Sequence, residues 1–164
     1  MGDLELSKDQ NRQELATKLE GILEPLKREL ETHPEISATE VQLRIDHHNL
    51  NLLSKHFQNG NFSFWAGILE RGVPDYSEIP HTPAAIIKNL SIPEKLRGRG
   101  VGPKIVGIWE ESLSNQGIKI FLATNISNQR AIQFWRKLCY AIPIEQSRRK
   151  IPYLMYKIIR SPEI

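Results

Sequence analysis

The sequence predicts an α/β fold, because two stretches of strand-like sequence are each followed at once by a helical pattern. The first stretch, residues 84–92, is mainly apolar, and apolar side chains recur at helical spacing after Pro103. The second stretch, residues 118–125, precedes a helical pattern over residues 128–140. Strands that alternate with helices are typical of this class. At 164 residues the chain has the length of one domain, residues 1–164.

The first element that we expect is an amphipathic helix over residues 9–31, within an N-terminal helical extension of residues 1–35. Pro25 lies inside this helix and predicts a kink. The apolar residues that recur at helical spacing are Leu15, Leu19, Ile22, Leu23, Leu26 and Leu30. This stripe could pack on the domain's own sheet or on a second copy of the chain, so a homodimer is one expectation.

Apolar and polar residues alternate over residues 41–45, which predicts a short strand. Ser37 and Glu40 also form a capping box that could begin a helix. We prefer the strand.

The segment after this strand allows two interpretations. We expect a helix that Asp46 caps and that ends at Asn59 and Gly60. Its apolar face would carry Leu50, Leu53 and Phe57. The alternative takes Asn59 and Gly60 as a tight hairpin between two strands. Residues 62–69 then form a strand, and residues 71–83, with three prolines, form a surface loop of a length that often shapes a binding site.

The segment between residues 84–92 and Pro103 carries glycine at every second position, at Gly98, Gly100 and Gly102. Glycines let the backbone approach a ligand closely, and a helix start offers unpaired N–H groups and a positive dipole end. The spacing fits neither the dinucleotide fingerprint nor the Walker loop. These features predict a phosphate-binding loop, and the alternative is an exposed turn without a ligand.

The charges are unevenly distributed along the chain. Residues 1–80 hold 8 Lys and Arg against 14 Asp and Glu, a net charge of −6, whereas residues 81–164 hold 14 against 5, a net charge of +9. The basic residues that would surround a polyphosphate are Lys95, Arg97, Arg99 and Lys104. The run of basic residues at 148–150 is equally consistent with a solvated face. Nucleic acid would suit this charge, but the chain has neither interleaved exposed aromatics nor a recognition motif.

Composition is ordinary for a globular protein, with 40% hydrophobic and 25% charged residues. The single cysteine, Cys139, excludes an internal disulfide. No apolar run is long enough for a signal peptide or a membrane span, so we expect a cytoplasmic location and no membrane partner. His47 and His48 are the only close pair of histidines, and adjacent helical residues point in different directions, so we expect no metal site.

Two motifs resemble the GNAT superfamily of acyl-CoA-dependent N-acyltransferases. The family's acyl-CoA loop reads Gln/Arg-x-x-Gly-x-Gly/Ala, which Arg97, Gly100 and Gly102 match. Its following helix commonly reads Asn-x-x-Ala-x-x-Phe-Tyr-x-x-x-Gly-Phe, which corresponds here to Asn128, Ala131, Phe134, Trp135, Cys139 and Tyr140. The resemblance covers residues 84–159, the expected acyl-CoA-binding core. It implies a central mixed sheet with helices on both sides.

The resemblance also implies an activity, the direct transfer of an acetyl group from acetyl-CoA to a primary amine. Backbone near the end of the 84–92 strand would hold the pantetheine arm and polarise the thioester carbonyl. The implied acyl-CoA-binding residues are Leu90, Ser91, Ile92, Arg97, Gly98, Arg99, Gly100, Val101, Gly102, Asn128 and Trp135. Asn128 could instead cap its helix, and Arg130 could reach the adenine or remain a surface residue. Asn125 faces the cleft in the family pattern.

The chain departs from the family where acid catalysis is expected. Trp135 occupies the place of the tyrosine that usually protonates the thiolate, and an indole N–H is too weak an acid for that task. Tyr140 is a substitute catalytic candidate, and the alternative is a core aromatic that closes the helix. Candidates for the base, by proximity in sequence alone, are Asp75, Glu78, His81 and Glu94. Cys139, in the place of the family's glycine, is expected to be a packing residue.

These departures support a second hypothesis, a non-catalytic acyl-CoA-binding or regulatory module. The N-terminal half also offers at most two strands before the 84–92 strand, fewer than the family usually has. The sequence leaves the amine open: a small polyamine or antibiotic, a protein N-terminus or lysine, or the aminoacyl end of a tRNA.

Overall fold

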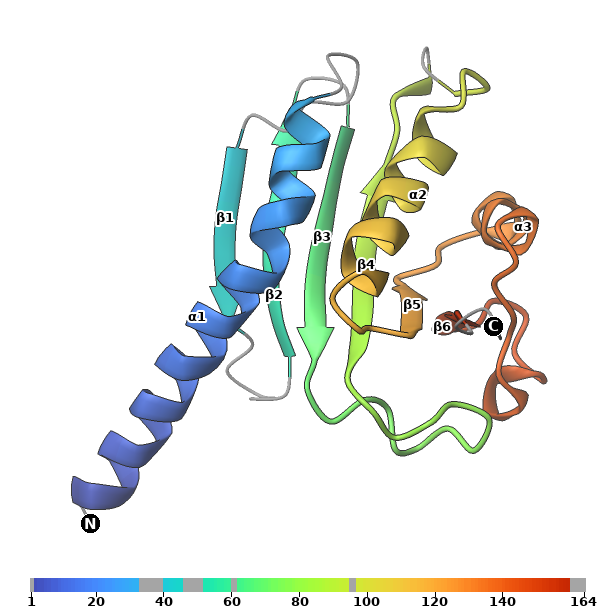
Figure 1. Ribbon diagram of the computed structural model, residues 1–164. Helices are drawn as coiled ribbons and strands as arrows, with labels where there is room; N and C mark the ends of the chain where they lie inside the picture. The colour runs from blue at the N-terminus through green and yellow to red at the C-terminus, as the bar shows by residue number, and fades with distance from the viewer. Residues whose placement is uncertain (1, 33–39, 46–51, 60–61, 95–96, 160–164) are drawn as a thin grey trace, which may run out of the picture.

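A computed structural model describes residues 2–32, 40–45, 52–59, 62–94 and 97–159. In chain order its elements are α1 (Gly2–Glu31), β1 (Glu40–Ile45), β2 (Leu52–Asn59), β3 (Phe62–Leu69), β4 (Ala84–Ser91), α2 (Val101–Ser114), β5 (Ile120–Thr124), α3 (Gln129–Lys137), the 3-10 turn η2 (Ile144–Gln146) and β6 (Leu154–Ile158). The strands form one sheet of six in chain order, β1 to β6, in which β4 and β5 are parallel and the other neighbours are antiparallel (Figure 1). The predicted α/β fold with a mixed sheet is confirmed.

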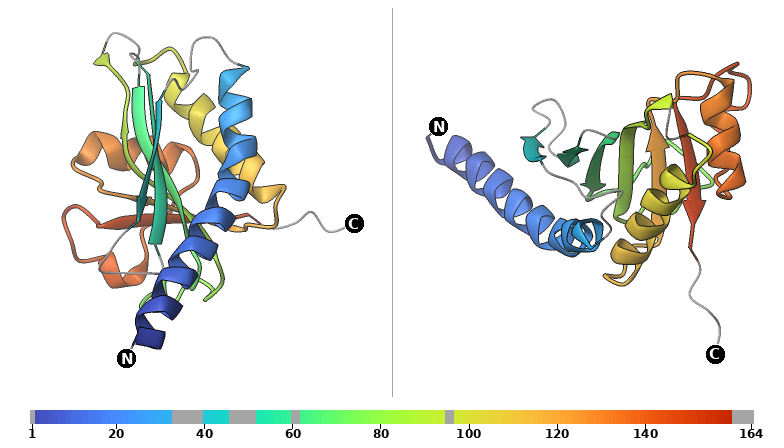
Figure 2. Two further views of the ribbon diagram at one scale, coloured as in Figure 1. Left: turned by 90° about the vertical axis from the view of Figure 1, so that its left-hand side faces the viewer. Right: turned by 90° about the horizontal axis from the view of Figure 1, so that it is seen from above.

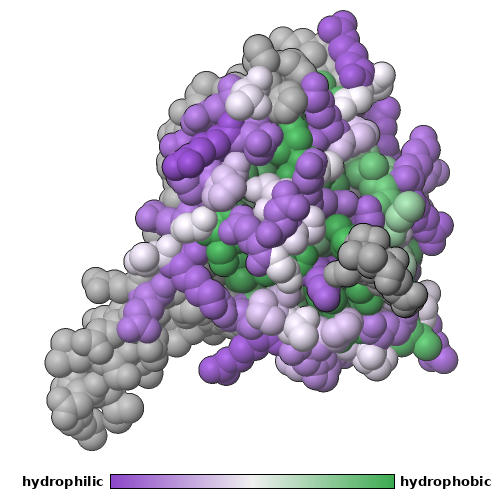
Figure 3. Space-filling view, in the orientation of Figure 1, coloured by the Kyte–Doolittle hydropathy of each residue, from purple (hydrophilic) through white to green (hydrophobic). Residues whose placement is uncertain are grey.

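Helices cover both faces of the sheet. Helices α1 and α2 lie on one side of strands β1–β4, and α3 with the segment that follows it lies toward the other side (Figure 2). The buried residues of α3, Ile132 and Trp135, nevertheless join the same hydrophobic cluster as α2. Alternate residues of each strand point to opposite faces, which divides the core in two. On β4, for example, Ala85 and Ile87 belong to the cluster under α1 and α2, whereas Ala84 and Ile86 belong to a second cluster on the other face. Hydrophilic side chains cover much of the α1–α2 face, with hydrophobic atoms visible between them (Figure 3).

The leading helix packs on the chain's own core. Leu23, Leu26 and Leu30 are fully buried in the cluster that α2 and the sheet share. Gln116, just beyond α2, donates from Nε2 to the carbonyl oxygen of Ile22 at 2.8 Å. The helix begins at Gly2 rather than at residue 9, and it continues through Pro25, whose side chain is exposed. The side chains of Leu15 and Leu19 lie outside those that the structure describes.

The predicted helix between residues 46 and 60 is wrong, and the alternative of a hairpin is right. Residues 52–59 form β2, which pairs antiparallel with β3 from Asn59 opposite Phe62 onward. Phe57 stacks on Phe64 across the two strands with ring centroids 5.1 Å apart, a contact that only the extended pairing provides. Asp46 and Leu50 lie outside the described residues. With β1 as predicted, three strands precede β4, so the apparent shortage of strands came from this misassigned segment.

Strand β6 was not predicted from the sequence. It pairs antiparallel with β5, with Tyr156 opposite Leu122, and an isolated bridge joins Tyr156 to Ala141. The predicted strands at 62–69, 84–92 and 118–125 and the helices at 103 onward and 128–140 are confirmed within a few residues. In the part of the chain that the structure describes, no helix is both long and apolar enough to span a membrane.

Candidate functional site

The glycine loop forms the turn that leads from β4 into α2. Gly98 has φ +81° and Gly100 has φ +78°, left-handed values that favour glycine. Gly100 is the N-cap of α2, and no side chain caps that end or places an acidic group in the first turn. A Cβ on either glycine would meet nothing within 4 Å. Because no side chain caps this end, the first N–H groups of α2 remain available to an anion.

Arg97 fixes the loop to the end of β4. Its Nε donates to the carbonyl oxygen of Ile92 at 3.1 Å, and its backbone N–H donates to that of Glu94 at 3.1 Å. Arg99 and Lys104 are exposed beside it. Lys95 lies outside the described residues. Three of the four predicted basic residues are thus brought together around the start of α2.

Gly102 has a different role from the other two glycines. A Cβ at this position would stand 2.9 Å from the ring of Phe134 on α3. The glycine therefore allows α3 to pack directly against the start of α2. Sequence reasoning attributed this glycine to close approach of a phosphate, whereas the contact present is with a side chain.

Strands β4 and β5 separate just beyond their parallel pairing, which ends at Lys88 opposite Thr124. Asn89 and Asn125 follow these residues with left-handed φ of +54° and +58°, and Asn125 Nδ2 donates to Asn89 Oδ1 at 3.0 Å. The register of β4 against β3 also shifts here, as at a β-bulge. Because β4 runs on to Ser91 while β5 ends, β5 offers no backbone partner to the last residues of β4.

A pocket of about 300 Å³ lies at this separation. Its lining residues are Tyr76, Ile86, Lys88, Thr124, Asn125, Ile126, Tyr153 and Leu154. Ile86 and Leu154 belong to the core cluster on the face away from α1 and α2, so the pocket opens on that face. Thr124 Oγ1 is buried without a hydrogen-bond partner. The pocket thus combines an apolar body with a few polar groups at the point where two strands diverge, as ligand sites commonly do.

Tyr76, which lines the pocket, belongs to the 71–83 loop, and hydrogen bonds join this loop to the segment around η2. Gln146 Nε2 donates to Tyr76 Oη at 3.1 Å, and Ser77 Oγ donates to a Glu145 carboxylate oxygen at 2.9 Å. Glu78 accepts from Tyr156 Oη at 2.7 Å and from the backbone N–H of Ile144. The hydrogen bond to Glu78 raises the pKa of Tyr156 to about 12. The loop is therefore fixed in place beside β6, as its predicted role in shaping a site requires.

Helix α3 has well-formed ends. Asn128 Oδ1 accepts from the backbone N–H of Ala131 at 2.9 Å, so this side chain caps the helix. At the other end, Tyr140 N–H donates to the carbonyl of Trp135 at 3.0 Å and Cys139 N–H to that of Arg136 at 2.9 Å. These are the two bonds of a Schellman motif. Cys139 takes the left-handed position of that motif, with φ +73°, a position that glycine usually occupies at the ends of helices.

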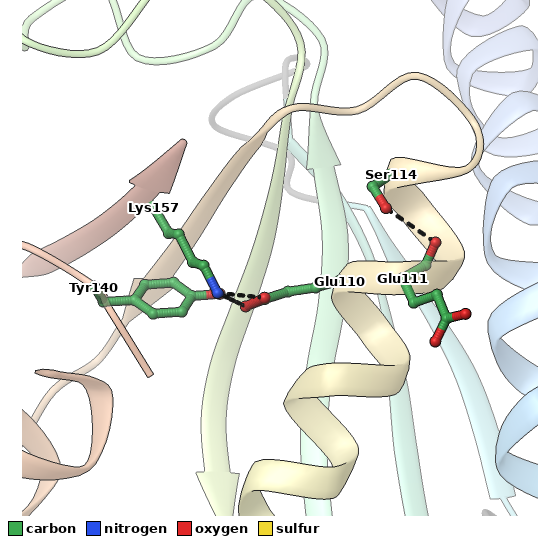
Figure 4. Close-up of polar contacts among 5 residues, drawn as sticks. All are labelled: Glu110, Glu111, Ser114, Tyr140 and Lys157. Carbon is green, nitrogen blue, oxygen red and sulfur yellow. Dashed lines mark hydrogen bonds and ion pairs between the residues drawn. The ribbon is translucent and has the colours of Figure 1, made fainter. Parts of the chain in front are cut away.

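Tyr140 is buried beneath α2. Its hydroxyl donates to Glu110 Oε2 at 3.0 Å, and Lys157 Nζ lies 2.7 Å from Glu110 Oε1 (Figure 4). Its ring also contacts that of Trp135, with centroids 4.8 Å apart, as the apolar contact of a Schellman motif. Burial, and then the charge of Glu110, raise the pKa of Tyr140 well above its ordinary value. A phenol held in this way keeps its proton, which favours the packing alternative.

Comparison with known protein families shows which family this chain belongs to. The sequence matches the family described as FR47-like protein over residues 67–149, half of the chain. The chain belongs to the FR47-like family. This family is related to the GNAT acetyltransferases, so the resemblance seen in the two motifs is confirmed. A search of the curated proteins found no match.

Solved structures with a similar fold include several acetyltransferases. AtaTR bound with AcCoA is 18% identical over 68% of this chain and 73% of that chain, with a TM-score of 0.43. The N-acetyltransferase YlbP of Bacillus subtilis, in complex with coenzyme A, is 14% identical over 66% of this chain and 72% of that chain, with a TM-score of 0.46. Naa50 of Arabidopsis thaliana, in complex with a bisubstrate analogue, is 16% identical over 63% and 71%, with a TM-score of 0.45.

The base candidates of this FR47-like domain lie outside the pocket lining. Glu78 is held by Tyr156 and Ile144, and Asp75, His81 and Glu94 are exposed. Sequence reasoning named Asn125 but missed its pairing with Asn89, although asparagine is the residue other than glycine that most readily adopts left-handed φ.

Sequence reasoning also missed the buried cluster of Glu110, Tyr140 and Lys157, whose members are far apart in the chain. Arg130 is exposed on the first turn of α3.

Proposed function

We propose that this FR47-like domain is an acetyl-CoA-dependent N-acetyltransferase that moves the acetyl group directly to a primary amine. The observation that carries the proposal is that one strand, β4, joins two features. Its end leads into an uncapped helix start flanked by basic side chains, and its pairing with β5 breaks beside a pocket. A long ligand with phosphates at one end and a reactive group at the other suits this arrangement.

In this proposal the pyrophosphate of the donor rests on the backbone of Gly98–Gly102. Arg97, Arg99 and Lys104 supply positive charge around it. The pantetheine arm then runs along the backbone of Leu90–Ile92, where β5 no longer pairs with β4.

Two residues of α3 border the donor in this proposal. Asn128 uses Oδ1 for the helix cap, and Nδ2, which donates to Ser127 Oγ at 3.4 Å, has a second hydrogen for the donor. Trp135 acts indirectly: its ring packs against that of Phe134, and Phe134 in turn contacts Gly102 of the glycine loop.

The proposed transfer does not require an acidic side chain. The neutral amine attacks the thioester carbonyl, a C–N bond forms, the C–S bond breaks, and the proton lost by nitrogen offsets the thiolate charge. Backbone N–H groups of Leu90–Ile92 would stabilise the oxyanion. Thiols have pKa values of about 8.5, so the leaving thiolate is protonated by solvent near neutral pH without a dedicated acid. If a dedicated acid is used, Tyr140 remains the candidate, although its hydroxyl is hydrogen-bonded to Glu110.

A second candidate function is acyl-CoA binding without transfer. Two observations favour it: the hydroxyl of Tyr140 is committed to Glu110, and the eight described lining residues of the pocket contain no carboxylate. Release of free thiol from acetyl-CoA in the presence of amines distinguishes the two, provided that binding is measured first.

The donor site is tested by a charge placed at Gly100. Asparagine and aspartate both tolerate left-handed φ and have the same size, so Gly100→Asn and Gly100→Asp differ in charge alone. We expect Gly100→Asp to weaken acetyl-CoA binding in calorimetry at least about tenfold more than Gly100→Asn does, or about 1.4 kcal/mol. Gly107→Asp, at an exposed position farther along α2 with open space around it, is the matched control. Equal affinity for all three variants and the wild type would refute the phosphate loop.

A further inference from the structure

We propose that the pocket between β4 and β5 binds an acceptor that carries a single amino group on an apolar body, and that the exposed ring of Tyr153 selects it. This inference rests on the proposed acetyl transfer and names the class of its acceptor. The lining includes Thr124, the last β5 residue that pairs with β4. An amine bound here therefore stands next to the backbone of Leu90–Ile92 that would hold the thioester.

Most of the pocket lining suits an apolar body. The aliphatic and aromatic lining residues are Ile86, Ile126, Leu154, Tyr76 and Tyr153. They offer contact to an aromatic ring or a short aliphatic chain. Thr124 Oγ1 is buried without a hydrogen-bond partner, and the N–H of a bound amine would supply one. The reaction is the balanced one given above: the amine nitrogen bonds to the acetyl carbon, the thiolate leaves, and the nitrogen's proton offsets its charge.

Tyr153 lines the pocket although its side chain is 61% exposed. Its backbone N–H donates to Gln146 Oε1 at 3.0 Å, and the Arg149 guanidinium lies 3.6 Å from its ring centroid. Gln146 is buried and also donates from Nε2 to Tyr76 Oη at 3.1 Å, so one side chain holds both tyrosines of the lining. An exposed ring that is fixed in this way offers a large apolar contact at little cost in conformational entropy.

A second charge on the acceptor finds no partner in this lining. None of the eight described lining residues is a carboxylate, so a second ammonium group would lose its water without gaining an ion pair. Beside the pocket, both oxygens of Glu78 accept hydrogen bonds, and Glu145 accepts from Ser77. Lys88, the one charged residue among the eight, already has an interaction of its own within the protein, so no contact with an anion is assigned to it. Arg149 is exposed, and water and salt screen its charge.

Three benzylamines with the same reacting amine and ring test the inference: 4-methylbenzylamine, 1,4-bis(aminomethyl)benzene and 4-(aminomethyl)benzoate. Their far ends are apolar, cationic and anionic. We expect thiol release from acetyl-CoA with kcat/KM highest for 4-methylbenzylamine, by at least about tenfold over each charged probe. Tyr153→Ala should lower this value at least about tenfold, and Tyr153→Phe should keep it within a few-fold. Ile144→Ala is the matched control and should change nothing, because Ile144 is 64% exposed on η2 but does not line the pocket.

Calorimetry with the neutral product, N-(4-methylbenzyl)acetamide, gives a second readout that needs no turnover. The amide should bind the CoA-loaded protein, and Tyr153→Ala should weaken this binding at least about tenfold. If the amide binds in this way and no probe releases thiol, the pocket stands and the proposed transferase activity fails. Equal rates for the three probes, a faster charged probe, or amide binding that is absent or that Tyr153→Ala leaves unchanged overturns the inference. Weakened binding of acetyl-CoA itself in Tyr153→Ala also overturns it, because the pocket would then belong to the donor.

Discussion

Cys139 carries backbone strain that a glycine would relieve. Its φ of +73° lies in the left-handed region, where a Cβ crowds the following carbonyl oxygen. This conformation costs an ordinary residue about 1–2 kcal/mol. The cysteine is exposed, so its side chain buries little apolar surface that a substitution would lose. The position is the one after the cap residue of α3, where glycine is the usual choice.

The expected gain follows from two opposing effects. Cys139→Gly removes the strain of about 1–2 kcal/mol, but glycine loses about 0.5–1 kcal/mol more conformational entropy on folding. We expect the free energy of unfolding to rise by about 0.5–1 kcal/mol. For a chain of 164 residues this corresponds to a rise in Tm of about 1–4 °C.

Urea unfolding followed by tryptophan fluorescence under reducing conditions measures the change. Arg136→Gly, at an exposed position inside α3, is the matched control and should lower the free energy of unfolding by about 1 kcal/mol. Cys139→Ala keeps the Cβ and should stay within about 0.5 kcal/mol of the wild type. A loss in Cys139→Gly equal to that in Arg136→Gly would refute the reasoning, and an equal gain in Cys139→Ala would assign the effect to the thiol.

Three further predictions concern the buried tyrosine, the leading helix and the cap of α3. Tyr140→Phe should lower the free energy of unfolding by about 1–2 kcal/mol, because a bond to the charged Glu110 is lost, while kcat stays within a few-fold. Because folding raises the pKa of Tyr140, the free energy of unfolding of the wild type should decrease as the pH rises above 10.0, the pKa of an unfolded tyrosine. The decrease should be smaller for Tyr140→Phe, and a pH profile that is flat or equal for the two proteins would contradict this. Deleting residues 1–32 should prevent folding, because three buried leucines contribute about 1.5–3 kcal/mol each, whereas a folded, monomeric truncation in light scattering would place the leucines outside the core. Asn128→Ala should cost about 1 kcal/mol and Asn128→Ser almost none, so a higher KM for acetyl-CoA in the serine variant alone would support a ligand role.

The elements that the sequence predicted correctly are those that local signals define. Glycines and a proline mark the boundary between the 84–92 strand and α2. The apolar residues at helical spacing after Pro103 are all buried on α2: Ile105, Val106, Trp109 and Leu113. Strand β2 lacks such signals, because its apolar residues happen to fall at helical spacing. Its conformation depends on partners elsewhere in the chain: Phe57 stacks on Phe64, and His56 stacks on Trp65 at 4.6 Å.

The candidate site also contains one part that the sequence predicts and one that it does not. The loop at Gly98 and Gly100 was predictable because left-handed turns at a helix start require glycine. The cluster of Glu110, Tyr140 and Lys157 was not, because a glutamate on an amphipathic helix is ordinarily solvated. Only the packing of α3 and β6 against α2 brings a hydroxyl and an ammonium group to it. Burial of a carboxylate is favourable only when such partners are present, and no local pattern reports them.

The helix motif that points to the acyl-CoA family has mainly packing roles in this chain. Asn128 caps α3, Phe134 covers Gly102, Trp135 contacts Tyr140, and Cys139 takes the left-handed position. Each residue type therefore has a structural reason to stand at its spacing whether or not a ligand binds. Because these contacts set α3 against the start of α2, they also fix the shape of the loop beside it. A match to the motif is consequently strong evidence for this arrangement of helices, whereas evidence for catalysis must come from measured transfer of the acetyl group from acetyl-CoA to an amine.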